Sequence, residues 1–483
     1  MRFIYNTTAI LILQKALLLQ YSFYKNAKST FYYENFYYKK NAGNYFRGLS
    51  MKNFIHYVSH SVAAMIGISI YILADTYFIA SYAGTDGLAV LNLVLPLYGL
   101  MNALGSMLGI GSATRYSIRK ARGKDVSSFF LQSLFWNAVF SLPFMLCGLF
   151  FPGMLLQLLG ADRTLQELGI PYVRTILPFA FFYMSNYTTT AYVRNDNHPS
   201  IAMMGSVFAS FFNIVFDYIF MFPMNMGMAG AALATGISPI VSSLFCLIHY
   251  CGKKNTIPFG WQVPRIKHLF ACCKLGLSNF VGEIANAVTI TTFNMLILNL
   301  SGNIGVASYG VIANISSVCT AIFNGLAQGV QPLMSQSYGK KERKELKKYL
   351  QYGIISSLIF SVLIIFFVNY KSDFFIALFN SENDAGLHAS AKEGIAVYFW
   401  AFLFGGINTL LVSYFSATNN PKPAFLTSLI RGTFAIIFFA LLLSSIWKML
   451  GVWLAFPCSE AFSFLVILYY YQKEQKENGR LKI

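Results

Sequence analysis

The chain contains long apolar stretches without a single charged residue. One of them, from Gly353 to Val368, reads GIISSLIFSVLIIFFV. A helix that crosses a bilayer needs about 20 mainly apolar residues, and a charged side chain in its middle is costly. Such stretches recur along the whole chain, separated by charged or Gly/Pro/Asn-rich breaks. The sequence therefore predicts an all-α, polytopic membrane protein.

The length suits twelve such helices, because twelve crossings need roughly 240 residues and the chain has 483. Only 11% of the residues are charged, whereas soluble domains carry roughly a quarter, and this argues against a soluble enzyme. We expect helices at residues 53–80, 87–113, 127–151, 168–193, 200–222, 228–250, 269–299, 304–335, 349–369, 393–417, 424–446 and 449–471.

Basic residues gather in alternate breaks between these predicted helices. Lys and Arg number 36 and Asp and Glu 18, which gives a net charge of +18. Because Lys and Arg concentrate in the cytoplasmic loops of membrane proteins, both termini are predicted to be cytoplasmic. The basic clusters then indicate topology and contact with inner-leaflet phospholipids, and we expect no nucleic-acid partner.

Residues 1–50 differ in composition from the rest of the chain. They are rich in Phe, Tyr, Asn, Lys and Ile, all of which use AT-rich codons. Arg47-Gly48 shortly before Met51 is also what an in-frame ribosome-binding site would encode. We therefore expect an extension that is disordered or that reflects a mis-assigned start, with Met51 as the native start. A genuine cytoplasmic tail is the alternative.

The two halves of the chain repeat each other. An offset of 218 places Gly84 on Gly302 and Ser117 on Ser335, and an offset of 222 places Asn197 on Asn419. Each unit has an even number of helices, so both enter the membrane from the same side and are related by an axis along its normal. We predict two pseudo-symmetric six-helix lobes, an N-lobe at 51–252 and a C-lobe at 269–471, with a cytoplasmic linker at 253–268 and a tail at 472–483.

Four acids lie within the predicted helices: Asp75, Asp217, Glu283 and Glu460. A carboxylate inside a membrane is a functional hypothesis by default, and none of the four has Lys or Arg one turn away. Asp75 and Asp217 are predicted to bind a proton or a small cation. Glu283 is predicted to be a further coupling or substrate acid, whereas Glu460 could simply bond to a helix neighbour.

Two polar side chains share a helix face with the first two acids. Tyr71 precedes Asp75 by one turn, and Asn213 precedes Asp217 by one turn. The repeat places Phe293 on Asp75, so the acids are not duplicated although the scaffold is. The seven cysteines and six histidines show no disulfide or metal-site spacing. We expect no cofactor apart from H+ or Na+ as coupling ion, and no metal other than Na+ at Asp75 and Asp217.

These residues resemble the multidrug and toxic compound extrusion (MATE) transporters from about Met51 to Tyr471. The matching runs are Ala74-Asp75-Thr76, Gly87-Leu88-Ala89, Arg194-Asn195-Asp196 with Pro199, Asn213 to Asp217, Gly230 to Thr235, and Gln328 to Leu333 with Ser335 and Tyr338-Gly339. The resemblance implies antiport of amphipathic, often cationic compounds against H+ or Na+. It also implies a cation site of Asp75, Asp217, Tyr71, Asn213 and Thr235, and it matches Glu283 to an acid of helix 7.

As such a transporter the protein is expected to act as a monomer in the bacterial cell (inner) membrane. Two departures from the family pattern stand out: no acid lies in helix 10 between Tyr398 and Tyr414, and no proline lies between Met51 and Leu73. The alternatives are a lipid-linked oligosaccharide flippase, which would need more basic residues in its cavity, and an intramembrane aspartyl protease, whose GxGD run is absent. The substrate, the choice between H+ and Na+ and the substrate-binding lobe stay open.

Overall fold

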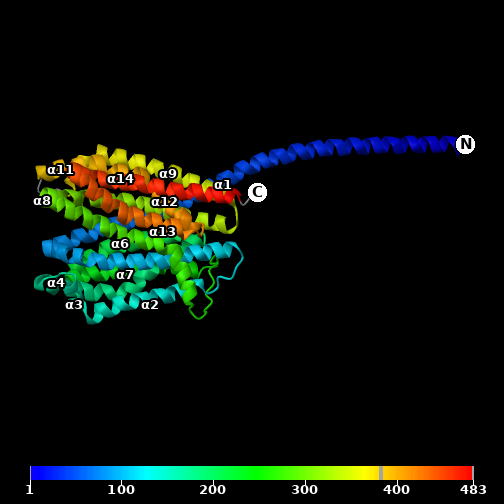
Figure 1. The fold of residues 1–483 in the computed structure, drawn as a ribbon. Helices are drawn as coiled ribbons and strands as arrows, with labels where there is room; N and C mark the ends of the chain where they lie inside the picture. The colour runs from blue at the N-terminus through cyan, green and yellow to red at the C-terminus, as the bar shows by residue number, and fades with distance from the viewer. Residues whose placement is uncertain (1, 380–383, 481–483) are drawn as a thin grey trace. The chain divides into compact units, whose positions relative to one another are not determined.

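The computed structural model describes residues 2–379 and 384–480, and it describes no side chains for residues 2–49, 85 and 478–480. Residues 1–55 and 56–483 form two separate units, and only the second is discussed below. The helices are α1 (Arg2–Ala121), α2 (Phe129–Phe150), α3 (Pro152–Leu158), α4 (Arg163–Ile176), α5 (Ala180–Asn195), α6 (Pro199–Met221), α7 (Gly227–Tyr250), α8 (Ile266–Gly339), α9 (Arg343–Tyr370), α10 (Ser372–Ala377), α11 (Ala385–Tyr398), α12 (Phe402–Ala417), α13 (Pro421–Leu429) and α14 (Ile436–Arg480). No strand occurs among the described residues (Figure 1).

The predicted all-α membrane fold is confirmed. Within the described ranges, nine helices are long and apolar enough to cross a membrane. Two of them, Ile266–Gly339 and Pro421–Glu477, each contain a break and so supply two predicted helices apiece. The predicted helix at 168–193 is formed by α4 and α5, with a 3-10 turn between them. All twelve predicted segments are therefore helical.

The backbone repeats at the offsets deduced from the sequence. Positive φ angles occur in pairs: Gly84 (59°) with Gly302 (62°), Gly123 (66°) with Lys341 (63°), and Asn197 (67°) with Asn419 (57°). L-residues other than Asn and Asp rarely adopt this conformation, so the matching is not expected by chance. The helices from α1 to α7, from residue 56 onward, are called the N-lobe here and those from α8 to α14 the C-lobe. The predicted lobe limits themselves stay predictions, and residues 481–483 of the predicted tail lie outside the described residues.

One irregularity breaks this repeat. Gly230 contacts Phe220 and Met221, whereas Gly451 contacts Leu443 and Ser444 in the C-lobe, so the offset rises from 222 before α6 to 223 at its end. The corresponding stretch of the C-lobe contains a π-helical segment, η3 (Ile430–Ala435), between α13 and α14. A π turn holds one residue more than an α turn. The C-lobe therefore accommodates one inserted residue without losing register on either side.

Each lobe has its own apolar core. One cluster of buried residues runs from Ile79 to Ala232 and the other from Phe293 to Ala455. Figure 1 accordingly shows α2, α3, α4, α6 and α7 grouped in one part of the molecule and α8, α9 and α11 to α14 in another. Each apolar core is thus built from residues of one lobe, and other residues make the contacts between the lobes.

Small residues let the two lobes touch backbone to backbone. A Cβ atom at Gly276 would lie 2.0 Å from the carbonyl oxygen of Met107, and one at Gly329 would lie 2.9 Å from Cα of Val58. Ser335 Oγ donates to Ser117 Oγ at 2.9 Å. These two serines are equivalent in the repeat, so their contact marks the pseudo-twofold axis between the lobes.

Candidate functional site

Asp75 and Asp217 meet in the N-lobe, although 142 residues separate them in the sequence. Asp75 lies in α1 and is 8% exposed, and Asp217 lies in α6 and is fully buried. Their carboxyl groups lie close enough to interact directly. Two buried carboxylates so close together cannot both be ionised at low cost, so the arrangement favours a proton or a cation at this place.

Asn213 and Thr235 extend this pair. Asn213 lies one turn before Asp217, and Thr235 lies on the adjacent helix α7. With its amide oriented to satisfy both neighbours, Asn213 donates to Asp217 Oδ2 at 3.0 Å and accepts from Thr235 Oγ1 at 3.0 Å. Gly230 allows the helices to approach, since a Cβ there would lie 2.8 Å from the carbonyl carbon of Phe220.

Two carboxyl oxygens in this cluster lack partners. Asp75 Oδ1 and Asp217 Oδ1 are buried and make no hydrogen bond within the described part of the chain. Buried polar atoms are almost always paired, so an unpaired carboxyl oxygen indicates a place for a proton or a cation. Together with the amide and hydroxyl oxygens next to them, they form the all-oxygen set that hard cations prefer.

Tyrosines surround the acids. Tyr71 is within electrostatic range of Asp75 and Asp217 but makes no hydrogen bond in the described ranges. Tyr172 of α4 is fully buried, is also within range of both acids, and its hydroxyl lies 3.0 Å from that of Tyr98. No spacing in the sequence singles out Tyr172, because its proximity to the acids depends on how α4 packs in the lobe, where it contacts α7.

Glu283 lies apart from this cluster, in α8 of the C-lobe. It is partly exposed and forms no ion pair among the described residues. Tyr183 and Tyr187, in α5 of the N-lobe, are within electrostatic range of it. Glu283 therefore faces the N-lobe across the boundary between the lobes, and it does not join Asp75 and Asp217.

The C-lobe has no equivalent of the N-lobe cluster. Gly451 packs against Leu443 and Ser444 as Gly230 packs against Phe220 and Met221, which aligns α14 with α7 at an offset of 221. The repeat then places apolar residues on both acids and on the amide and hydroxyl beside them: Phe293 on Asp75, Ile436 on Asn213, Ala440 on Asp217 and Phe456 on Thr235. Trp453 is fully buried in this region.

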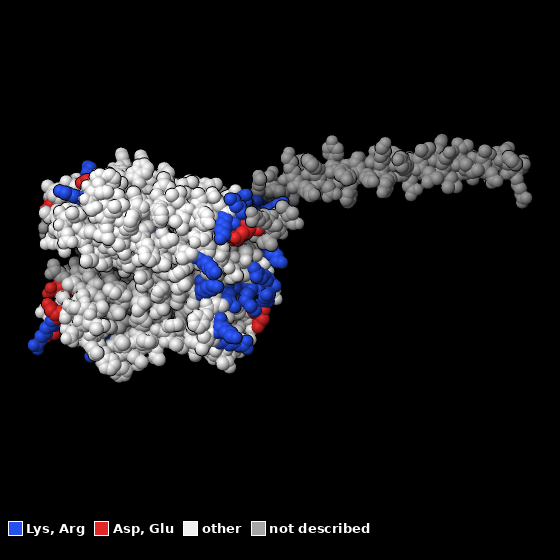
Figure 2. All heavy atoms as spheres, viewed as in Figure 1, with Lys and Arg blue, Asp and Glu red and all other residues white. Residues whose placement is uncertain are grey.

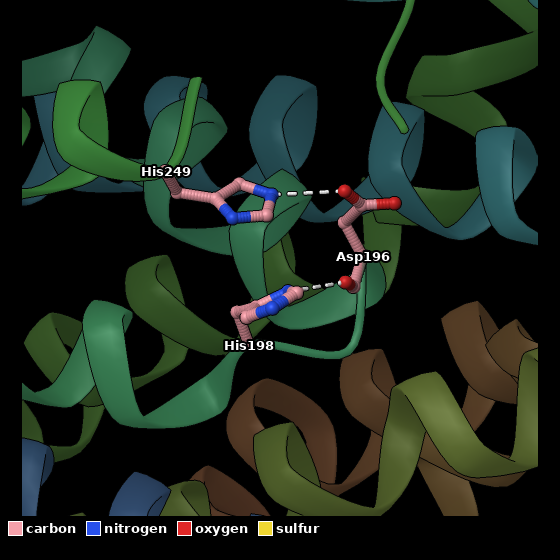
Figure 3. A group of neighbouring side chains, drawn as sticks. All are labelled: Asp196, His198 and His249. Carbon is pink, nitrogen blue, oxygen red and sulfur yellow. Dashed lines mark hydrogen bonds and ion pairs between the residues drawn. The ribbon is translucent and has the colours of Figure 1, made fainter. Parts of the chain in front are cut away.

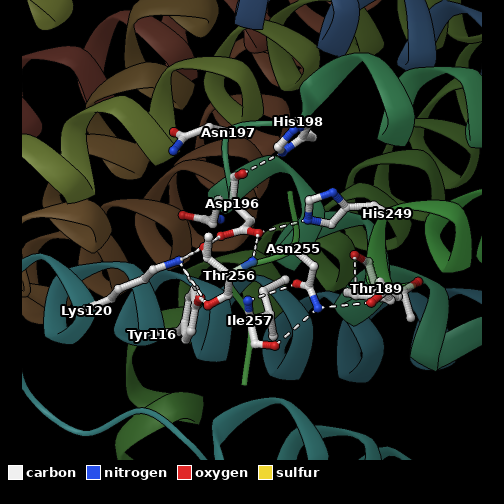
Figure 4. A network of polar contacts seen from close by, with 12 residues as sticks. Tyr116, Lys120, Thr189, Asp196, Asn197, His198, His249, Asn255, Thr256 and Ile257 are labelled. Carbon is white, nitrogen blue, oxygen red and sulfur yellow. Dashed lines mark hydrogen bonds and ion pairs between the residues drawn. The ribbon is translucent and has the colours of Figure 1, made fainter. Parts of the chain in front are cut away.

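A second polar network lies where the N-lobe helices end in basic loops. Asp196, between α5 and α6, accepts hydrogen bonds from Lys120 Nζ at 2.7 Å, His249 Nε2 at 2.8 Å and the Thr256 amide at 2.9 Å, and it also bonds the Thr256 hydroxyl (Figure 4). Thr256 belongs to the segment that leads into the C-lobe. Asp196 therefore fastens this segment to the N-lobe.

Asp196, His198 and His249 also resemble a metal site, because their ligand atoms lie within 4.8 Å of one another (Figure 3). The ammonium of Lys120 already contacts the carboxylate, and a cation there opposes a bound metal. Burial tends to raise the pKa of Asp196, but the hydrogen bonds from Lys120 and Thr256 outweigh it and hold the pKa below its usual value. Asp196 is thus an ionised carboxylate that holds the segment of Thr256 against the N-lobe.

The lobes make several polar contacts near this end of the molecule. Arg194 Nη1 donates to Gln328 Oε1 at 2.7 Å, and Gln331 Nε2 donates to Thr114 Oγ1 at 2.7 Å. Gln336 Nε2 donates to the carbonyl oxygen of Asn195 at 3.1 Å. Figure 2 shows Lys and Arg gathered at one end of residues 56–483, which we call the basic end. There the lobes are closed against each other.

Known proteins share this architecture. A family model described as MatE matches residues 61–219 and 280–442. The multidrug export protein MepA of Staphylococcus saprophyticus is 27% identical over 398 residues, which cover 80% of this chain and 85% of that protein. The MepA protein of Staphylococcus aureus is 25% identical over 389 residues, with 78% and 84% covered.

A solved structure described as the outward-facing conformation of a multidrug resistance MATE family transporter of the MOP superfamily has a TM-score of 0.84. It is 20% identical in sequence, with 89% of this chain and 97% of that chain covered. The family model spans more than half of the chain and matches once in each lobe. Its members are transporters and not enzymes, which rules out the protease alternative. The chain belongs to the MatE family of membrane transporters.

Proposed function

We propose that the protein exports amphipathic, mainly cationic small molecules from bacteria in exchange for H+ or Na+. The names of its relatives, which are multidrug export proteins, support the substrate class. The observation that carries the coupling is the buried contact between Asp75 and Asp217 with its two unpaired oxygens.

A cation at this site would act as a switch. Two buried carboxyl groups in contact cannot both be ionised at low cost, and a proton or Na+ compensates their charge. A ligand that binds one conformation better shifts the population toward it. Cation binding from outside would favour the N-lobe arrangement that releases the exported compound, and cation release to the inside would complete the cycle.

Glu283 is the proposed acid for the exported cation. It lies at the boundary between the lobes, within electrostatic range of Tyr183 and Tyr187. A carboxylate near tyrosines suits flat organic cations, which bind by charge attraction and by cation–π contact. This assignment keeps the substrate apart from the coupling site at Asp75 and Asp217.

The basic end is proposed to be cytoplasmic, because Lys and Arg favour the inner side and gather there (Figure 2). The inter-lobe contacts at this end would then close the path to the cytoplasm. The transporter is proposed to act as a monomer with both termini inside, in the cell membrane.

The test is dye efflux from proteoliposomes under an imposed pH or Na+ gradient. Asp75→Asn and Asp217→Asn should abolish the gradient-driven component, since an amide cannot exchange a proton and neutralises the cation site. Asp86→Asn is the matched control, because Asp86 is an exposed acid of the same helix, and it should retain efflux. Undiminished gradient-driven efflux in both site variants would refute the proposal, and the gradient that drives wild type identifies the ion.

A further inference from the structure

The linker between the lobes exposes large apolar side chains. It consists of residues 251–265, between α7 and α8. Trp261 is 62% exposed and Val263 is 77% exposed. Ile266 and Phe270, which lie one turn apart at the start of α8, are exposed as well. We call these four residues the apolar edge. Single exposed apolar residues are normal on a protein surface, but four within ten residues of one connection need a partner.

The linker is fastened to the N-lobe along its length. Besides the bonds of Thr256 to Asp196, the Gly260 amide donates to the carbonyl oxygen of Ser127 at 2.9 Å. Further along, Ser128 Oγ donates to a side-chain oxygen of the linker, Gln262 Oε1, at 3.3 Å. These bonds fix the path of the backbone, so the linker belongs to the N-lobe and is not a loose tether.

The apolar side chains of the linker point away from the N-lobe. A Cβ atom at Gly260 would lie 3.0 Å from Cβ of Ser127, and the side chain of Gln262 also faces the N-lobe. In an extended chain successive side chains point to opposite sides, so Trp261 and Val263 point outward. Proline at position 264 supports this conformation, because the residue before a proline is biased toward an extended backbone.

The ring of Trp261 lies beside the lipid-facing side of α2. Its centroid is 6.3 Å from that of Phe135, which is exposed on the same side of α2 as Leu142 and Leu146. The 22 residues of α2 span about 33 Å, close to the roughly 30 Å of a bilayer's hydrocarbon core. Phe135 lies about 9 Å along the helix from Phe129, its first residue. Trp261 therefore lies at the depth of the membrane surface.

Basic residues flank the apolar edge. Arg265 and Lys267 are exposed within it, and Lys253 and Lys254 are exposed at the beginning of the linker. Tryptophan is enriched where a membrane meets water, and Lys and Arg are attracted to anionic phospholipid headgroups. Protein–protein interfaces are instead depleted of Lys. The charges therefore favour a lipid surface over a protein as the partner of this edge.

We propose that the linker is a membrane anchor, in which the apolar edge inserts into the bilayer interface while Arg265 and Lys267 contact phospholipid headgroups. The linker then holds the basic end of the N-lobe at a fixed depth while the C-lobe moves relative to it. It is thus a part of the membrane-embedded surface and not an aqueous loop. The inference needs only that the chain lies in a membrane, so it is independent of the exported compound and of the coupling ion.

The test measures the depth of single spin labels by electron paramagnetic resonance. The full-length protein, in a cysteine-free background, is placed in nanodiscs of phosphatidylethanolamine and phosphatidylglycerol. Collisions with oxygen, which concentrates in the bilayer, are compared with collisions with a polar nickel chelate, which stays in water. The label is introduced by Val263→Cys, with Lys254→Cys as the matched control in the same linker and Leu146→Cys as the lipid reference on α2.

We expect the oxygen-to-nickel ratio at position 263 to be severalfold higher than at position 254 and to approach the ratio at position 146. A ratio equal to that at position 254 would place the linker in water and overturn the proposal. Poor access of both reagents would also overturn it, because a second copy of the chain or another part of the protein would then cover the edge.

A second variant tests the role of the ring. Trp261→Ser should lower the ratio at position 263, whereas Trp447→Ser, which changes an exposed tryptophan of α14, should leave it unchanged. Equal ratios in both variants would show that Trp261 does not hold the linker in the bilayer. A label introduced by Ile266→Cys measures the insertion with Trp261 intact, so the proposal stays testable even where the serine variant does not fold.

Discussion

Replacement of Gly276 by alanine should open the basic end of the molecule. The new Cβ atom would lie 2.0 Å from the carbonyl oxygen of Met107, which is a backbone atom and cannot rotate away. Ordinary contact begins at 3.4 Å, so α8 and α1 must separate locally by about 1.4 Å. Overpacking of this kind costs about 1–3 kcal/mol, and the cost falls only on the state in which the lobes touch. The population should shift about 5- to 150-fold toward the open state.

Double electron–electron resonance between spin labels at Lys124 and Lys344, in a cysteine-free background, would measure the shift. Both residues are exposed at the basic end, one in each lobe. Gly282→Ala is the control, since Gly282 lies in the same helix and has nothing within 4 Å of its Cβ position. The long-distance population should grow in the Gly276 variant and not in the control. A well-folded Gly276→Ala protein with an unchanged distance distribution would show that this contact does not hold the lobes closed.

Three further predictions concern stability and coupling. Asp196→Asn should lower the free energy of unfolding by about 2 kcal/mol, measured by thermal unfolding in detergent, whereas exposed Asp125→Asn should have little effect. The pKa of Asp196 lies below its usual 3.8 in the folded protein, so the stability that the carboxylate contributes is complete above pH 3.8 and is lost in stronger acid. The difference in unfolding free energy between wild type and Asp196→Asn should therefore shrink as the pH falls below 3.8. Gly84→Ala and Gly302→Ala should each cost about 1 kcal/mol in the same assay, because both positions have positive φ and open surroundings; unequal costs would contradict their equivalence. Thr235→Val keeps the volume but removes the hydroxyl partner of the Asn213 amide, and it should raise the cation concentration for half-maximal efflux about tenfold; an unchanged value would exclude Thr235 from the site.

Much of the fold follows from the sequence because a membrane imposes simple rules. The cost of buried charge separates helices from loops, and glycines such as Gly84 and Gly302 recur where both lobes need the same turn. The sequence predicts a break between helices at each of these glycines, and the backbone leaves the helical conformation there, with φ and ψ of 59° and −142° at Gly84 and of 62° and −154° at Gly302. How the helices on either side of a break pack against the rest of the lobe depends on contacts that no local pattern records.

The site was predictable in its chemistry and not in its contacts. The rarity of acids inside the membrane singles out Asp75 and Asp217, but only the packing of α1 on α6 brings them together. Arg431 and Glu460 were both visible in the sequence as charges inside helices, yet 29 residues and a turn separate them, so nothing local pairs them. Glu460 does bond helical neighbours, but they lie in α12 and η3 and not in its own helix.

The extra residue in η3 suggests how one half of a duplicated protein can diverge. A substitution replaces one side chain at a position that both copies share, so it must respect the packing inherited there. An insertion absorbed by a single π turn creates a position with no counterpart in the other copy, while the helix before and after it keeps its old neighbours. The segment that carries Arg431 could therefore have acquired its guanidinium at little structural cost to the ancestral scaffold.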